Sequence, residues 1–297
     1  MEEALHRVLH NSRFEMSSNP SESIEYMESH GIPVAHIPII SLAKLEAKDQ
    51  GEISLLRDTA SAIGLFLLSF RGATQEESVL SHLPEVYAAY EKYFHQPTEA
   101  KAKDIRLDIK ASQDLGWKKG RGGESFEFSR DEVALWADTN SGLPQALREQ
   151  WNRISEFSSG CDDTCLTMLN SLSTDFAVHH RTGQPSDTGL KAVLHPSVAK
   201  LSEVGETLHT DGGTMTLLFY MDWSIHAFLS DAERWAFIPP LEGCALINVG
   251  DSLQKMSGGE LHSPAHRVTQ PFDGAKKRYY LSYYLRPETA WAEHHGE

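Results

Sequence analysis

The second half of the chain consists of short apolar runs separated by turn residues. Runs of four to eight residues that are rich in β-branched and aromatic side chains and bounded by Gly, Pro or Asp are typical of β-strands. We expect strands at residues 192–195, 214–221, 235–238, 244–249, 266–269 and 278–285. A series of short strands with such turns predicts an antiparallel jelly-roll barrel.

The first half is patterned mainly for helices. Apolar residues recur at helical spacing from residue 42 and again over 143–178, with a possible break at Gly160. A further helix is expected over 75–94, interrupted by Pro84, and short apolar strands are expected at 33–40 and 64–68. The predicted fold class is therefore mainly β with flanking helices (α+β), in which N-terminal helices brace a jelly-roll core.

Composition and charge exclude several classes of partner. The 297 residues include 27 Lys and Arg against 42 Asp and Glu, a net charge of −15, which argues against nucleic acid or an anionic membrane as the main partner. No apolar run reaches the roughly 18 residues of a membrane span, and the N-terminus lacks the apolar core of a signal peptide. Three cysteines are too few for a disulfide framework, so we expect a cytoplasmic protein with small, buried thiols.

Two histidines and an aspartate form a candidate metal site. His209 and Asp211 are separated by one residue, so on an extended strand both side chains project from the same face. His266 lies far enough downstream for an intervening pair of hairpins to bring it beside them. Two imidazoles and one carboxylate that leave the other positions of an octahedral metal open are the ligand set of non-haem Fe(II) oxygenases.

Several ordered motifs accompany these ligands. They are the run from Leu208 to Phe219, the run from Ile247 to Gln254, the run from Ser263 to Val268, and the strand that begins at Arg278. With them the chain resembles the isopenicillin-N-synthase-like branch of the Fe(II)/2-oxoglutarate-dependent dioxygenases, over roughly residues 33–287. The resemblance implies a double-stranded β-helix (cupin-like) core over 111–290, preceded by a helical and strand region over 1–110 that belongs to the same structural unit.

The resemblance also implies an activity and a co-substrate pocket. Fe(II), 2-oxoglutarate and O2 oxidise a C–H bond of a small, secondary-metabolite-like substrate, with release of succinate and CO2. Arg278 matches the arginine that binds the distal carboxylate of 2-oxoglutarate, but Tyr280 stands where the Arg-x-Ser motif has serine, and His195 stands where the usual second phenol is expected. A 2-oxoglutarate-independent Fe(II) oxidase and a non-catalytic ligand-binding protein on the same fold therefore remain alternatives.

Candidate substrate contacts are mostly aromatic. Residues 110–130 correspond to the mouth of the active site in the resembling family, which makes Trp117, Phe126 and Phe128 candidates, although large aromatics more often pack in a core. Phe219 and Tyr220 alternate along a predicted strand, so one of them should point inward, and Phe219 is retained as a candidate. His226 would bind a polar substrate group, unless it is a tolerated strand or turn residue.

Overall fold

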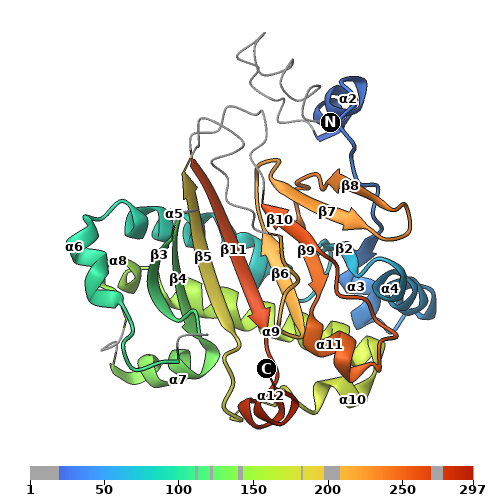
Figure 1. Ribbon diagram of the computed structural model, residues 1–297. Helices are drawn as coiled ribbons and strands as arrows, with labels where there is room; N and C mark the ends of the chain where they lie inside the picture. The colour runs from blue at the N-terminus through green and yellow to red at the C-terminus, as the bar shows by residue number, and fades with distance from the viewer. Residues whose placement is uncertain are drawn as a thin grey trace.

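Two β-sheets form the centre of the protein (Figure 1). The computed structural model describes residues 20–110, 113–120, 123–139, 143–181, 183–196, 208–268 and 277–296. The larger sheet holds, in spatial order, β1 (Ile39–Ser41), β2 (Leu65–Ser69), β9 (Cys244–Val249), β6 (Met215–Phe219), β11 (Lys277–Leu285), β5 (Gly189–Pro196), β4 (Gly123–Ser129) and β3 (Gly116–Gly120). The smaller sheet holds β10 (His266–Val268), β7 (Ile225–Leu229) and β8 (Arg234–Phe237). The strands pair antiparallel, apart from β1 and β2.

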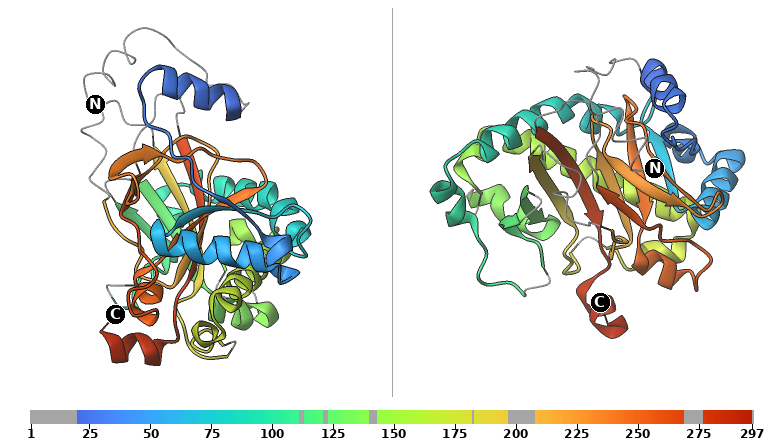
Figure 2. Two further views of the ribbon diagram at one scale, coloured as in Figure 1. Left: turned by 90° about the vertical axis from the view of Figure 1, so that its right-hand side faces the viewer. Right: turned by 45° about the horizontal axis from the view of Figure 1, so that its top comes forward.

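Helices cover one face of the larger sheet, and the smaller sheet lies on its other face (Figure 2). The helices are α2 (Pro20–Ser29), α3 (Leu42–Glu46), α4 (Gln50–Ala62), α5 (Leu83–Phe94), α6 (Thr98–Lys101), α7 (Arg130–Thr139), α8 (Gln145–Arg148), α9 (Trp151–Leu172), α10 (Thr174–Ala177), α11 (Asp251–Met256) and α12 (Thr289–His295). A π-helical turn spans Glu77–Ser81 and a 3-10 turn spans Ala102–Asp104. The long α9 and α5 pack on the strands at the centre of the larger sheet.

Strand alternation divides the interior into two parts. On β6, Met215, Leu217 and Phe219 belong to the cluster that packs against the helices, whereas Leu218 belongs to the cluster between the two sheets. The same division holds on β9, where Ile247 faces the helices and Leu246 faces the smaller sheet. The interior therefore has one apolar cluster under the helices and a second cluster between the two sheets.

Most predicted elements exist, but their boundaries shift. The strand predicted over 33–40 is regular only in β1, although Val34 forms a single bridge with Phe237. Pro84 lies in the first turn of α5, where its missing N–H costs nothing, and the helix predicted from residue 75 begins instead as the separate π-helical turn. β1 and β2 come from the predicted N-terminal region, residues 1–110, and lie in the same sheet as strands of the predicted core, residues 111–290. Strands of the two regions therefore pair directly with each other.

The predicted break at Gly160 is wrong, because α9 runs through it without interruption. A Cβ atom at this position would lie 2.5 Å from Ser78 Oγ and 2.9 Å from Val79 Cγ2. Gly160 therefore allows the π-helical turn to approach α9 closely, and it does not end the helix.

Two of the three cysteines are buried, as expected for small structural thiols. Cys161 and Cys165 are buried in α9 within the main apolar cluster, and burial raises the pKa of both thiols. Within the described ranges, no helix is both long and apolar enough to cross a membrane.

Candidate metal centre

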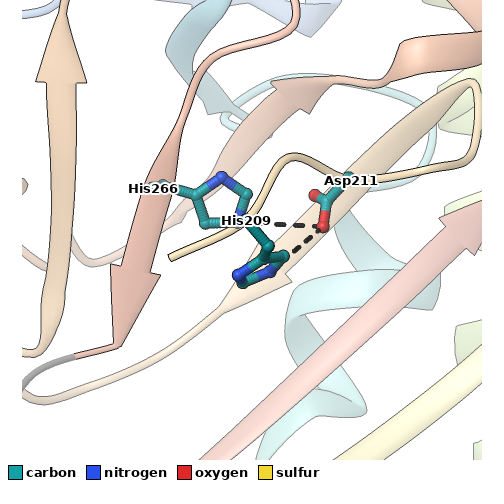
Figure 3. Close-up of side chains that lie close together, drawn as sticks. All are labelled: His209, Asp211 and His266. Carbon is teal, nitrogen blue, oxygen red and sulfur yellow. Dashed lines mark ion pairs between the residues drawn. The ribbon is translucent and has the colours of Figure 1, made fainter. Parts of the chain in front are cut away.

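His209, Asp211 and His266 converge at one end of the space between the sheets (Figure 3). One donor atom from each lies within 4.8 Å of the others. Asp211 Oδ1 is 3.7 Å from His209 Nε2 and 3.7 Å from His266 Nε2. Asp211 and His266 are buried, whereas the His209 side chain is 46% exposed. Among the described residues, this is the only group of three or more His, Cys, Asp or Glu side chains with such geometry.

A backbone bridge places the two histidines side by side. The His209 N–H donates to the His266 carbonyl at 3.0 Å, and the His266 N–H donates to the His209 carbonyl at 2.9 Å. The prediction of a strand running through His209 and Asp211 is wrong: His209 makes an isolated bridge, Asp211 lies in the following loop, and β6 begins only at Met215. The side chains converge because the loop turns Asp211 back toward the bridge.

The segment that starts α11 holds the loop carrying Asp211. The Asp251 N–H donates to the Asp211 carbonyl at 2.8 Å, and Ser252 Oγ donates to the Gly212 carbonyl at 2.8 Å. Gly250 lies directly against this loop, because a Cβ atom there would be 2.0 Å from the Gly213 carbonyl oxygen. The loop is thus fixed through its own backbone.

Neighbouring groups orient two of the three side chains, those of His266 and Asp211, for metal binding. The Nδ1 atom of His266 lies 3.1 Å from the Pro264 carbonyl, which requires the proton on Nδ1 and leaves the Nε2 lone pair toward Asp211. Asn248 Nδ2 donates to Asp211 Oδ2 at 3.0 Å, so Oδ1 is the oxygen that faces both imidazoles. Burial lowers the pKa of His266, which favours the neutral, ligating form. A divalent cation fits this donor set.

A cavity of about 350 Å³, with a mostly apolar lining, opens beside the three side chains. Its floor is formed by alternate residues of two neighbouring strands, which are Lys191, Val193 and His195 on β5 and Tyr280, Ser282 and Tyr284 on β11. The volume lies within the usual range for small-ligand pockets. The site therefore combines a metal-ligand group with space for small molecules.

Comparison with known proteins identifies the family. The model of the 2OG-Fe(II) oxygenase superfamily matches residues 193–287. The 2-oxoglutarate-dependent dioxygenase iboH of Amanita muscaria is 33% identical over 160 residues, which are 50% of this chain and 78% of that protein. Oxidoreductase vrtI of Penicillium aethiopicum is 30% identical over 275 residues, 86% of this chain and 65% of that protein. The chain belongs to the 2OG-Fe(II) oxygenase superfamily. It is a 2-oxoglutarate-dependent dioxygenase, an oxidoreductase whose cofactors are Fe(II) and 2-oxoglutarate, as predicted.

Solved structures confirm the predicted jelly-roll fold of this dioxygenase. A full-length Neurospora crassa protein in complex with alpha-KG superimposes with a TM-score of 0.70 at 19% identity, over 84% of this chain and 85% of that chain. JOX2 in complex with 2OG, Fe and JA superimposes with a TM-score of 0.67 at 20% identity, over 87% of this chain and 77% of that chain.

The three residues predicted for the co-substrate pocket of the dioxygenase lie together. Arg278, on the same face of β11 as Tyr280, is only 3% exposed and pairs in register with His195 on β5. The ring of Tyr280 meets the His195 ring edge-on, with 5.4 Å between the centroids. Tyr280 and His195 line the cavity, and Arg278 lies beyond them along the strand.

The predicted aromatic substrate contacts lie away from the cavity of the dioxygenase. Trp117, Phe126, Phe128 and Phe219 belong to the cluster that packs against the helices, on the opposite face of the larger sheet. Their strand neighbours Lys118, Ser125 and Leu218 line the cavity instead. This placement corrects the prediction for these four aromatics, because one step along a strand reverses the face to which a side chain points.

His226 is also outside the cavity. Its ring stacks on Phe237 with centroids 4.6 Å apart, and its Nδ1 atom accepts a hydrogen bond from Arg267 Nε at 3.2 Å. The neighbouring Ile225 points to the other face of β7 and lines the cavity. His226 thus packs on the outer side of the smaller sheet, and β7 was missed as a strand because both of its faces are covered.

The buried histidines predict a pH dependence of the metal-free dioxygenase. Burial lowers the pKa of both His180 and His226 to about 4. The unfolded chain protonates these side chains near pH 6.5, so it binds more protons than the folded state between about pH 6.5 and 4. We expect the free energy of unfolding to fall as the pH drops through this window, by about 3 kcal/mol per histidine at the lower end.

Urea titrations from pH 7 to pH 4.5 measure the free energy of unfolding. In His226→Gln this energy should fall less steeply with decreasing pH than in the wild-type protein. The same slope in both proteins would contradict the assignment of His226.

Proposed function

We propose that this dioxygenase oxidises a C–H bond of a small molecule in the cavity, with Fe(II) bound by His209, Asp211 and His266. The convergence of their donor atoms within 4.8 Å beside a cavity of about 350 Å³ is the observation that carries the proposal. Two structural relatives were solved with small molecules, thymine in the Neurospora crassa protein and JA in JOX2. A secondary-metabolite-like substrate suits a cavity of this size.

The three proposed ligands and Asn248 have different roles at the proposed iron site. His209, Asp211 and His266 would hold Fe(II), and the metal would supply the binding site for the 2-oxo acid and O2. Asn248 occupies Oδ2 of Asp211, which favours binding of the metal through Oδ1 alone. The bound iron and 2-oxoglutarate supply the oxidising chemistry, in which 2-oxoglutarate is converted to succinate and CO2.

Arg278, Tyr280 and His195 are proposed to bind the far end of 2-oxoglutarate. A guanidinium is a planar, permanently charged partner for a carboxylate, and burial strengthens such a pair. Tyr280 replaces the smaller hydroxyl of the Arg-x-Ser motif with a phenol that can also donate a hydrogen bond. His195 stands beside it on β5.

Product analysis tests the proposed function. Purified protein with Fe(II), ascorbate and O2 should convert 2-oxoglutarate to succinate, slowly alone and faster with a substrate. O2 consumption driven by a substrate without succinate formation would support the oxidase alternative. Tight binding of a small ligand with neither O2 uptake nor succinate under any of these conditions would support the ligand-binding alternative.

Replacement of Arg278 should weaken 2-oxoglutarate binding. In Arg278→Met the distal carboxylate loses a buried, charged partner, so we expect the Kd for 2-oxoglutarate to rise roughly tenfold to hundredfold. Arg278→Lys keeps the charge but loses the paired hydrogen-bond geometry, so its Kd should lie between those of the wild-type protein and Arg278→Met. Anaerobic titration of the visible absorption of the Fe(II)–2-oxoglutarate complex measures the Kd. Arg234→Met, at an exposed arginine on β8, is the matched control; equal Kd values in Arg278→Met and this control would contradict the role of Arg278.

A further inference from the structure

Two lysines form part of the cavity wall on β3 and β5, at the far side of the larger sheet from β9. Lys191 shares the cavity face of β5 with Val193 and His195, and Lys118 lines the cavity from β3. The Lys191 side chain is 16% exposed. Neither lysine belongs to the proposed iron or 2-oxoglutarate sites.

The ammonium group of Lys191 retains capacity to bind a further partner. Its Nζ atom donates to Asp114 Oδ2 at 2.6 Å and lies 3.9 Å from Glu127 Oε2 and 5.8 Å from the centroid of the Tyr284 ring. Within the described part of the chain, Asp114 is the only acceptor of a hydrogen bond from this nitrogen. An ammonium group carries three donors, so it can also donate to a ligand in the cavity.

Each of the two carboxylates nearest to Lys191 also contacts a second cation. Asp114 is shared, because Lys118 Nζ donates to its Oδ1 atom at 2.9 Å while Lys191 holds Oδ2. Glu127 pairs closely with Arg286, at 2.6 Å, and more distantly with Lys191, at 3.9 Å.

Glu124, which also lines the cavity, pairs with Lys101 and accepts a hydrogen bond from Trp117 Nε1. Of the carboxylates that the structure describes, Asp114 is thus the one within hydrogen-bonding distance of both ammonium groups, and Lys191 keeps donors that can bind an anion in the cavity. The Lys191 side chain is largely buried, so its charge attracts an anion more strongly than the same charge at the surface, whereas the Lys118 side chain is 39% exposed.

We infer that the substrate is a small carboxylic acid whose carboxylate binds to Lys191 and Lys118. This inference rests on the proposed function, since it assigns the substrate of the same cavity. The carbon skeleton of the acid extends from the lysines toward the iron site, over the apolar side chains of Val193, Leu218 and Val268. The carboxylate selects the substrate and fixes which carbon faces the metal.

Matched acids and amides test the inference without knowledge of the natural substrate. The probes are phenylacetate, 3-phenylpropanoate and 4-phenylbutanoate, each with its primary amide, which has a similar shape but no charge. Each is titrated anaerobically into the protein loaded with Fe(II) and 2-oxoglutarate, and binding is followed by calorimetry and by the change in visible absorption. We expect at least one acid to bind roughly tenfold to hundredfold more tightly than its amide.

Substitutions of the two lysines test whether they cause the preference for the acid over the amide. Lys191→Met and Lys118→Met should each reduce the preference for the acid at least roughly tenfold, whereas Lys191→Arg should retain most of it. Lys119→Met, at the exposed neighbour of Lys118 on β3, is the matched control and should keep the full preference. Lys118→Met also covers the case in which Lys191→Met does not fold.

Three results would overturn the inference. The first is a series in which no acid binds more tightly than its amide. The second is a preference that survives in both methionine variants. The third is a loss of 2-oxoglutarate affinity in Lys191→Met with an unchanged preference for the acid, which would place Lys191 in the co-substrate site. In all three, the wild-type protein still binds Fe(II) and 2-oxoglutarate, whereas failure of the proposed function would remove that binding.

Discussion

Asp211→Ala should abolish succinate formation, with a decrease in rate of at least roughly 1,000-fold, equivalent to about 4 kcal/mol. The carboxylate is the only anionic group among the three proposed ligands, and its Oδ1 atom lies 3.7 Å from both imidazole nitrogens. Its removal also takes away the acceptor for the buried Asn248 amide. The remaining two histidines would hold Fe(II) weakly and without fixed geometry.

Iron content and succinate yield, measured on the same preparations, check this expectation. Asp231→Ala, an exposed aspartate in the turn between β7 and β8, is the control and should retain both. Circular dichroism separates a lost metal from a lost fold. If Asp211→Ala kept its iron and more than a tenth of the wild-type rate, the proposed ligand set would be wrong.

Gly250→Ala should disrupt the metal site without replacing any of the proposed ligands. The added Cβ would lie 2.0 Å from the Gly213 carbonyl oxygen and 3.1 Å from the Asp211 carbonyl oxygen, so the loop carrying Asp211 must move. Forcing a carbon atom into a packed backbone costs about 3 kcal/mol. We expect a lower melting temperature and a large loss of iron affinity together.

Gly212→Ala provides a matched control in the same loop. A Cβ atom at Gly212 meets no other atom within 4 Å, so the same chemical change should leave the melting temperature and iron binding almost unaltered. Thermal denaturation and anaerobic iron titration of the two variants make the comparison. Equal behaviour of the two alanine variants would show that the close contact at Gly250 does not hold the loop.

The sequence predicted which three side chains meet at the candidate metal site more successfully than it predicted their local structure. The family motifs around His209, Asp211 and His266 identified which side chains meet. The argument that His209 and Asp211 share one strand face was nevertheless wrong. A backbone bridge between two distant segments and a turn bring the three side chains together. Such a bridge depends on the pairing of distant segments, and hydrophobic periodicity along one segment does not report it.

For the cavity wall formed by β3, β4 and β5, the sequence indicated the right parts of the chain but missed several of the residues that line the cavity. Large aromatics drew attention to Trp117 and Phe126, but these pack toward the helices, and the cavity belongs to their polar neighbours Lys118 and Ser125. A pattern of alternation defines two faces without saying which one is covered by helices. The predicted strand at 192–195 also began too late to include Lys191, which β5 contains. A lysine within an otherwise apolar strand was the available signal.

The backbone bridge between His209 and His266 has a consequence for how such an enzyme can diversify. Two peptide hydrogen bonds tie the imidazoles to each other, so their separation is independent of the length of chain that runs between them. The turn of the β7–β8 hairpin lies within that interval but outside the paired strands, so it can lengthen or shorten while both nitrogens stay in place. New substrate preferences can therefore arise in this hairpin during evolution at little risk to the iron.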